Sequence, residues 1–453
     1  MMRQRTAWIL AAFLALSLAG CGRAGISFRV PVEYHKLRND LKVVLSPDDT
    51  APIVAVAVYY NIGFRIEPRN RTGFAHLFEH MMFQGSGNLE KGAFFRLIQG
   101  QGGVFNGSTR FDFTNYYEIL PAHKLETALW AEADRMKSLD VSPDNLKNQQ
   151  GVVVNEVKVS VLNQPYGGFP WLDMPQVANE NWFNAHNFYG DIQDLEAATP
   201  EEVMDFFKSY YTPNNAVLVI TGDFKPGEAL AMVKKHFEAV APFPRPEFPD
   251  ISEPRQEKEK TFSNDDPLAN KPALALAYHV PERLSAEFFA MGLLDQILLK
   301  GQDSLLYQAL VKKEGLTGAV SGGINLLGSM FNYQGPMLWT LSLFYDDIAS
   351  SEKIISVVDA VIEQVRTSPV PREDLDTALV KLRSGLFDTM GSGFGRADLL
   401  ACFALFDDNP SAVNELEKQF QAVTPELILK TAQEYLRPSN RTVLTIRPKK
   451  AAQ

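Results

Sequence analysis

Alternating and continuous apolar runs define the first strands that the sequence predicts. Residues 32–47 alternate between apolar and polar positions, which indicates a pair of β-strands. Residues 53–60 are apolar on both faces of a strand, as in a central strand that is covered from each side. Residues 74–83 follow a glycine and contain no helix breaker, so we expect a helix there.

A pattern rich in threonine, glycine and aromatic residues fills residues 102–121. Its period-two alternation predicts two strands. A glycine-rich strand with an exposed edge can pair with an extended peptide, although an ordinary hairpin explains the pattern equally well. The next element is a helix that starts at Ser142, a capping residue, followed by Pro143 at the first helical position, and that runs toward Pro165.

The second half of the chain repeats the pattern of the first. Identical or similar residues recur 225 positions apart without a gap, at residues 199–201, 210, 213, 215, 218 and 219 and again at 424–426, 435, 438, 440, 443 and 444. Residues 273–278 and 288–300 are the counterparts of the first-half central strand and helix. The repeat predicts two duplicated α+β domains, each a mostly antiparallel sheet packed with helices.

Length and composition agree with such a division. A chain of 453 residues with 45% hydrophobic residues is too long for one core. We expect an N-terminal domain at residues 21–245, a proline-rich and charged linker at 246–268, and a C-terminal domain at 269–449. A net charge of −10 argues against a nucleic-acid partner, which calls for a basic surface.

Residues 1–20 have the form of an export signal. Arg3 and Arg5 precede an apolar run at residues 8–18 that is too short to span a bilayer. The run ends before Cys21 and resembles a bacterial lipoprotein signal, which implies a lipid-modified Cys21 as the only membrane attachment. Gly22 in place of aspartate favours the periplasmic face of the outer membrane of a Gram-negative bacterium. A plain secretory signal is the alternative. The remaining cysteine, Cys402, lies in an apolar stretch and is expected to pack in a helix.

The sequence H-x-x-E-H at residues 76–80 is the clearest chemical motif. His76 and His80 are four residues apart, so on a helix both imidazoles lie on one face and can bind one ion. Zinc suits two neutral imidazoles, and a catalytic zinc site needs a third protein ligand. Glu79 is placed to act as a general base toward the attacking water without being a ligand.

A third ligand decides between a metal site and two hydrogen-bonded histidines on an amphipathic helix. Glu156 is a candidate, because a carboxylate completes a set of two histidines and one glutamate. By itself, a glutamate at this position is more often a solvated helix residue. The second half of the chain contains no H-x-x-E-H, so only the first half is equipped for a metal.

In combination these motifs resemble the inverzincin peptidases, the family of pitrilysin, insulysin and the mitochondrial processing peptidase. The similarity extends over residues 32–448, includes the duplication, and rests on motifs that follow in the family's order. They are Gly73, the H-x-x-E-H sequence, a Gly-Gly-x-x-Asn run ending at Asn106, Thr109, Asn155-Glu156 and residues 163–167. The resemblance implies that His76, His80 and Glu156 bind one zinc ion and that Glu79 is the base.

The resemblance also implies a substrate-binding edge strand at Asn106 and Gly107, where the family more often has alanine in place of Gly107. Many members carry a glutamate two helical turns before the third ligand, but this chain has Gln149 there.

Relatives that act unaided have an arginine and a tyrosine in the second half that help to hold the substrate. The aligned positions here are Leu305 and Gly318, which cannot donate a hydrogen bond from a side chain. We therefore expect a zinc endopeptidase for peptides or unfolded segments that forms a heterodimer with a homologous partner subunit, which supplies this pair. A homodimer is the alternative assembly. The alternative is a non-catalytic scaffold or peptide-binding subunit of the same fold.

Overall fold

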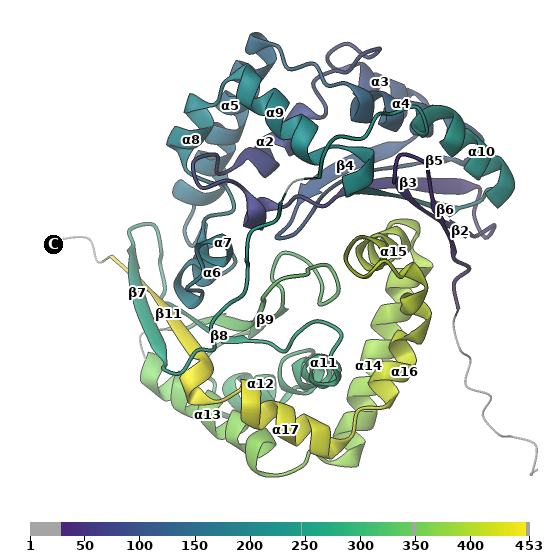
Figure 1. Cartoon of the computed structure of the whole chain (residues 1–453). Coiled ribbons are helices and arrows are strands. Elements are labelled where there is room, and N and C mark those ends of the chain that lie inside the picture. The colour runs from purple at the N-terminus through teal and green to yellow at the C-terminus, as the bar shows by residue number, and fades with distance from the viewer. Residues whose placement is uncertain (1–28, 246, 347–349, 450–453) are drawn as a thin grey trace, which may run out of the picture. The chain divides into compact units, whose positions relative to one another are not determined.

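A six-stranded sheet carries the N-terminal half of the computed structural model, which describes residues 29–245, 247–346 and 350–449 (Figure 1). Its strand order is β1-β2-β6-β3-β5-β4. The strands are β1 (Glu33–Lys36), β2 (Lys42–Pro47), β3 (Ile53–Tyr60), β4 (Val104–Thr109), β5 (Thr114–Pro121) and β6 (Ala216–Gly222). Only β2 and β6 pair in parallel within this sheet. The predicted strands before residue 60 and between residues 102 and 121 are confirmed. The predicted export signal and Cys21 lie outside the described residues.

The central strand β3 is buried on both faces, as its continuous apolar sequence predicts. Alternate side chains, from Val54 to Tyr60, belong to the main hydrophobic core of this half. On the other face, the Tyr59 hydroxyl donates a 2.8 Å hydrogen bond to Asp398 in helix α15 (Gly393–Asp407). Cys402 is fully buried in the same helix, as expected.

The structure confirms the helices predicted at residues 74–83 and from Ser142 onward. The Ser142 hydroxyl caps α5 by accepting from the Asn145 backbone N–H, and Pro143 is the first helical residue. Residues 158–162 continue α5 as a π-helix. The helices are α2 (Phe74–Met81), α3 (Ala93–Gly100), α4 (Leu125–Lys137), α5 (Pro143–Val157), α6 (Asp173–Ala178), α7 (Trp182–Ala185), α8 (Ile192–Ala197), α9 (Pro200–Tyr210) and α10 (Pro226–Phe237).

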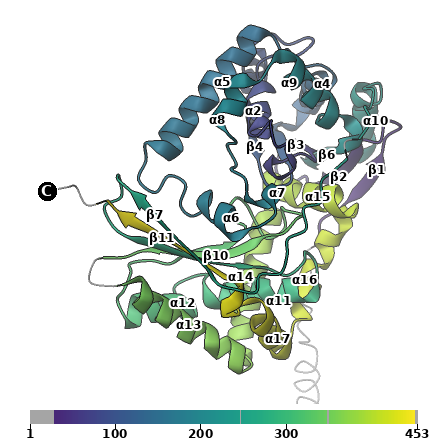
Figure 2. The ribbon, with the colours of Figure 1, turned by 60° about the vertical axis from the view of Figure 1, so that its left-hand side comes forward.

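A five-stranded sheet of the same topology forms the C-terminal half. Its order is β7-β11-β8-β10-β9, and β11 runs parallel to β7 and antiparallel to β8, as β6 does with β2 and β3. Figure 2 shows α11 (Ala286–Leu298), α13 (Ser351–Thr367) and α17 (Pro425–Tyr435) on one side of this sheet and α6 on the other. The strands are β7 (Lys260–Asp266), β8 (Ala273–His279), β9 (Ser321–Ile324), β10 (Leu338–Phe344) and β11 (Arg441–Pro448).

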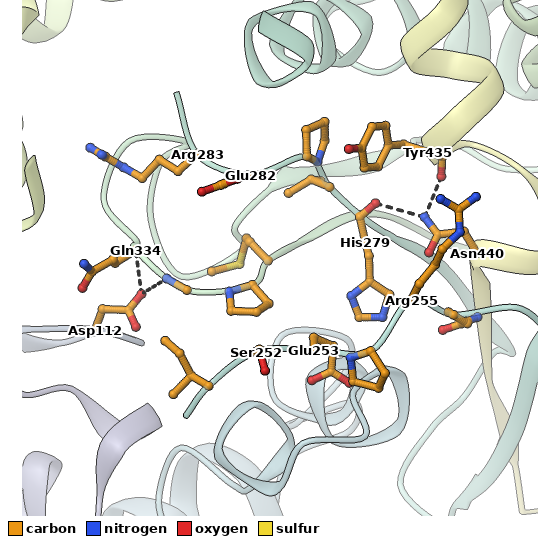
Figure 3. Close-up of a pocket in the computed structure, with 18 of the residues that line it drawn as sticks. Asp112, Ser252, Glu253, Arg255, His279, Glu282, Arg283, Gln334, Tyr435 and Asn440 are labelled. Atoms are coloured by element: carbon orange, nitrogen blue, oxygen red, sulfur yellow. Dashed lines mark hydrogen bonds between the residues drawn. The ribbon is translucent and has the colours of Figure 1, made fainter. Parts of the chain in front are cut away.

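Repeated asparagines make the same hydrogen bonds in both halves. The Asn215 side chain donates to the carbonyl oxygens of Tyr210 and Asn61, at 2.9 and 3.3 Å. The Asn440 side chain donates to those of Tyr435 and His279, at 2.7 and 3.0 Å (Figure 3). Each asparagine ties the end of a helix to the end of the central strand, so the duplication extends to individual contacts.

The predicted linker at residues 246–268 is too long at its C-terminal end. β7 begins at Lys260 and is the counterpart of β2, so the second sheet starts before residue 269. Most side chains of β7 are exposed because it is an edge strand. Its polar, charged sequence therefore resembles a linker and lacks the apolar alternation of a half-buried strand.

The helices of the C-terminal half are α11 (Ala286–Leu298), α12 (Leu305–Tyr307), α13 (Ser351–Thr367), α14 (Arg372–Gly391), α15 (Gly393–Asp407), α16 (Leu416–Gln421) and α17 (Pro425–Tyr435). α17 and β11 repeat the helix-then-strand unit of α9 and β6, as the sequence predicts. Among the helices of the described ranges, none has the length and apolar character needed to cross a membrane.

Candidate metal centre

Two helices bring the three predicted ligands together. His76 and His80 lie on α2 and Glu156 lies in the last turn of α5, with their ligand atoms within 4.8 Å of one another. Nε2 of His80 is 3.3 Å from Oε2 of Glu156, and Nε2 of His76 is 3.6 Å from Oε1. Ligands bound to a tetrahedral zinc at about 2.0–2.1 Å are about 3.3 Å apart. The spacing therefore fits one zinc ion.

The imidazole of His76 lacks hydrogen bonds that its burial requires. The residue is 4% exposed, and its Nδ1 is buried with no hydrogen-bond partner among the described residues. Its Nε2 lies 3.6 Å from Glu156, beyond an ordinary hydrogen bond. Buried polar groups of native proteins almost always have a partner. A cation bound by Nε2 would give that nitrogen a partner, whereas Nδ1 keeps none among the described residues.

His76 and Glu156 have the protonation states that a metal requires. Burial, and secondarily the charge of His80, lowers the pKa of His76 to about 4, so its imidazole is neutral at pH 7. The hydrogen bond with His80 is the main cause that lowers the pKa of Glu156, which is therefore ionised. Neutral imidazole and carboxylate are the metal-binding forms of these side chains.

Glu79 lies beside the ligand set and contacts strand β4. The Thr109 hydroxyl donates a 2.9 Å hydrogen bond to Oε2 of Glu79. Burial raises the pKa of Glu79, an effect that the Thr109 hydrogen bond partly offsets. A carboxylate with a raised pKa is a better proton acceptor near neutral pH. Gly107 packs against the same side chain, since a Cβ there would lie 3.2 Å from Cγ of Glu79.

The start of α2 is held by a buried carboxylate that the sequence patterns did not single out. Glu67 is completely buried, and its two oxygens accept hydrogen bonds from the backbone N–H groups of Gly73 and Ala75, at 2.8 and 2.5 Å. Gly73 provides no side-chain cap and has a φ of 81°, which favours glycine. Glu67 thus caps the helix next to its first ligand, His76, from outside the helix.

The irregular segment between α7 and α8 supplies a second group of contacts that the sequence did not predict. The Tyr189 hydroxyl donates to Oε1 of Glu156 at 3.3 Å. Phe188 and Tyr189 pack against the His76 ring, with ring centroids 5.3 and 5.1 Å away. Burial, followed by the charge of Glu156, raises the pKa of Tyr189, so its hydroxyl stays protonated. No motif or periodicity marks this segment in the sequence.

The other predicted site residues lie on the elements expected for them. Asn106 is exposed on β4, at the free edge of the first sheet, and its side-chain oxygen accepts from the Gly107 N–H. Gln149 is buried in α5 and donates to the Asn148 side chain. Leu305 begins α12 and is half-buried, whereas Gly318 is exposed before β9.

A cavity of about 830 Å³ lies elsewhere, lined by Asp112 of the N-terminal half and by His279 and Arg283 of the C-terminal half (Figure 3). Its lining residues do not include the three metal ligands or Glu79. The cavity is therefore separate from the His76–His80–Glu156 cluster.

Comparisons with known proteins agree with this architecture. Residues 42–166 match the family profile described as insulinase (peptidase family M16), and residues 197–382 match the profile described as peptidase M16 inactive domain. The zinc protease PqqE of Helicobacter pylori is 25% identical over 418 residues, which are 91% of this chain and 92% of that protein.

Two further similarities cover most of the chain. The mitochondrial-processing peptidase subunit beta of Lentinula edodes is 21% identical over 89% of this chain and 87% of that protein. The crystal structure of a protease from Helicobacter pylori superposes with a TM-score of 0.86 and 24% identity, over 92% of this chain and all of that one.

The fold and the histidine–glutamate cluster define a duplicated α+β protein of the zinc peptidase class. Within the part of the chain that the structure describes, the cluster that could bind a metal lies in the first half. Both halves match profiles of one family, and together the matches span more than half of the sequence. The chain belongs to peptidase family M16.

Proposed function

We propose that this chain is a zinc-dependent endopeptidase that hydrolyses peptides or unfolded polypeptide segments. His76, His80 and Glu156 would hold one zinc ion, and Glu79 is the general base. The observation that carries the proposal is the convergence of three ligand atoms within 4.8 Å, beside a carboxylate that is not a ligand. They come from two helices, and His80 and Glu156 are 76 residues apart in the chain.

The reaction needs a base that also returns a proton. Bound zinc supplies a Lewis acid that polarises the scissile carbonyl and favours ionisation of the attacking water. Thr109 holds Oε2 of Glu79, which leaves Oε1 to take the proton of that water. The same oxygen then donates the proton to the leaving amine nitrogen. The pKa of Glu79, raised by burial, suits both steps.

The free edge of β4 offers a place for the substrate backbone. β4 pairs only with β5 in the first sheet, and it carries Asn106 and Gly107, of which Gly107 lies next to Glu79. An extended peptide that adds a strand here would pass the base and the ligands. This arrangement favours unfolded segments over folded proteins as substrates.

A partner subunit would complete the site. Leu305 and Gly318 stand where an arginine and a tyrosine are expected, and one similar protein is named as a beta subunit. Loss of one donor to the developing oxyanion typically costs roughly 100- to 1,000-fold in rate. We therefore expect a homologous chain to supply both donors.

The chain purified alone should cleave an unfolded peptide slowly, roughly 100- to 1,000-fold below the rate with its partner. This residual cleavage, followed by mass spectrometry, should disappear with a zinc chelator and return with added zinc. An ordinary rate for the isolated chain would refute the need for a partner. Zinc binding without hydrolysis, even with the partner, would favour a peptide-binding or scaffold subunit instead.

The scaffold is the second candidate because one observation favours it. The second half matches a profile described as an inactive domain. A scaffold has no use for the complete set of His76, His80, Glu156 and Glu79, so the peptidase remains our proposal.

We also propose that Cys21 carries a lipid anchor on the periplasmic face of an outer membrane. The apolar run at residues 8–18 followed by Leu-Ala-Gly-Cys supports this. The intact mass of the mature protein tests it, since acylation adds fatty acyl mass at Cys21 and a plain secretory signal does not.

A further inference from the structure

Tyr189 contacts both elements of the proposed metal centre. Its hydroxyl donates to Oε1 of Glu156 on α5, at 3.3 Å. Its ring meets the His76 ring of α2 edge-on, with centroids 5.1 Å apart and planes at 78°. Tyr189 is 7% exposed and comes from neither helix. One side chain therefore contacts ligands that come from two separate helices.

The backbone of Tyr189 is fixed against the start of α2. A Cβ on Gly73 would lie 2.4 Å from the Tyr189 carbonyl oxygen, and a Cβ on Gly190 would lie 2.2 Å from the Gly73 nitrogen. The two backbones therefore touch, and only glycine fits at either position. The Tyr189 N–H is also held, by the Asn187 side chain at 2.8 Å. The ring thus has a defined position relative to α2.

Glu156 has more freedom than the histidines and needs such support. Its side chain is 33% exposed, whereas that of His76 is 5% exposed. A partly exposed glutamate samples several rotamers, and fixing one of them costs conformational entropy. The hydrogen bond from Tyr189 engages Oε1, the oxygen that faces His76, while Oε2 faces His80.

We propose that Tyr189 is a positioning residue that orients the Glu156 carboxylate so that one oxygen faces each histidine. This inference rests on the proposed zinc site and adds a residue to it. Tyr189 acts through Glu156 and His76 and takes no part in proton transfer. Outer-shell partners of metal ligands typically contribute 10- to 100-fold to metal affinity.

The test compares Tyr189→Phe with Tyr210→Phe in the full-length chain. Each variant removes one hydroxyl from a tyrosine that is largely shielded from solvent, but Tyr210 packs on Phe206 and, among the described residues, has no hydrogen bond to a ligand. Zinc affinity is measured by competition with a chromophoric chelator. We expect Y189F to bind zinc roughly 10- to 100-fold more weakly and Y210F to match the wild type. The visible absorption of the cobalt-substituted protein should change in Y189F alone.

Each result of this comparison either supports or overturns the positioning role of Tyr189. Equal zinc affinity and an unchanged cobalt spectrum in Y189F would overturn the proposal. So would a Y189F chain that unfolds when metal-free, because the hydroxyl would then serve stability. None of these readouts needs turnover, so a wild-type chain that binds zinc but hydrolyses nothing even with its partner refutes the peptidase and leaves the positioning role intact. A wild-type chain without zinc affinity would refute both the peptidase and the positioning role of Tyr189.

Discussion

Replacement of Glu79 by glutamine should lower peptide hydrolysis by roughly 100- to 10,000-fold, the usual contribution of general acid–base catalysis, while zinc remains bound. The amide has nearly the same shape as the carboxylate, and its oxygen can still accept the 2.9 Å hydrogen bond from Thr109. It cannot take up a proton from water at neutral pH. The three ligands are unchanged, so the metal should stay in place.

The rate of hydrolysis and the zinc content must be measured on the same preparation. kcat/KM for an unfolded peptide and the zinc content should be determined for the wild type, Glu79→Gln and Glu196→Gln. Glu196 is an exposed glutamate of α8 and serves as the matched control. Full activity in the Glu79 variant would show that another group is the base. Loss of zinc would place Glu79 among the ligands.

Replacement of Glu156 by glutamine should remove zinc from the protein. A neutral amide oxygen is a much weaker ligand than the carboxylate, and the remaining pair, His76 and His80, is too few for a catalytic zinc site. The loss of affinity should exceed the roughly 10- to 100-fold that is typical of an outer-shell partner. Hydrolysis should fall with it, because no Lewis acid remains.

Zinc titration of Glu156→Gln checks this expectation, again with Glu196→Gln as the control. Activity of the Glu156 variant at saturating zinc separates the two roles of the residue. Recovery of the wild-type rate at high zinc would confirm that Glu156 only holds the metal. Wild-type zinc affinity in this variant would show that the third ligand is another residue.

Much of the fold follows from local patterns in the sequence. The apolar residues 53–60 predict a strand covered on both faces, and the structure places core residues on one face and α15 on the other. The 225-residue repeat predicts two domains, and its asparagines make equivalent hydrogen bonds. The sequence does not mark β7 as a strand. An exposed edge strand needs no apolar face, so its residues do not alternate between apolar and polar.

Part of the candidate site also follows from local sequence patterns, and part depends on how the folded chain packs. Spacing along one helix is enough to place His76 and His80 together, because side chains four residues apart share a face. Their approach to Glu156 depends on the packing of α2 against α5, which no local pattern encodes. Donor chemistry makes Glu156 a candidate ligand, and the family resemblance makes it the expected one. Glu67 and Tyr189 act from irregular segments, where no periodicity links a residue to its contacts.

The central claim is that one cation is bound between α2 and α5. A crystal structure of the zinc-loaded chain, with anomalous diffraction recorded on both sides of the zinc absorption edge, tests it most directly. We predict one anomalous peak per chain, about 2.0–2.1 Å from Nε2 of His76, Nε2 of His80 and a carboxylate oxygen of Glu156. A peak at other residues, or no peak in protein saturated with zinc, would contradict the account.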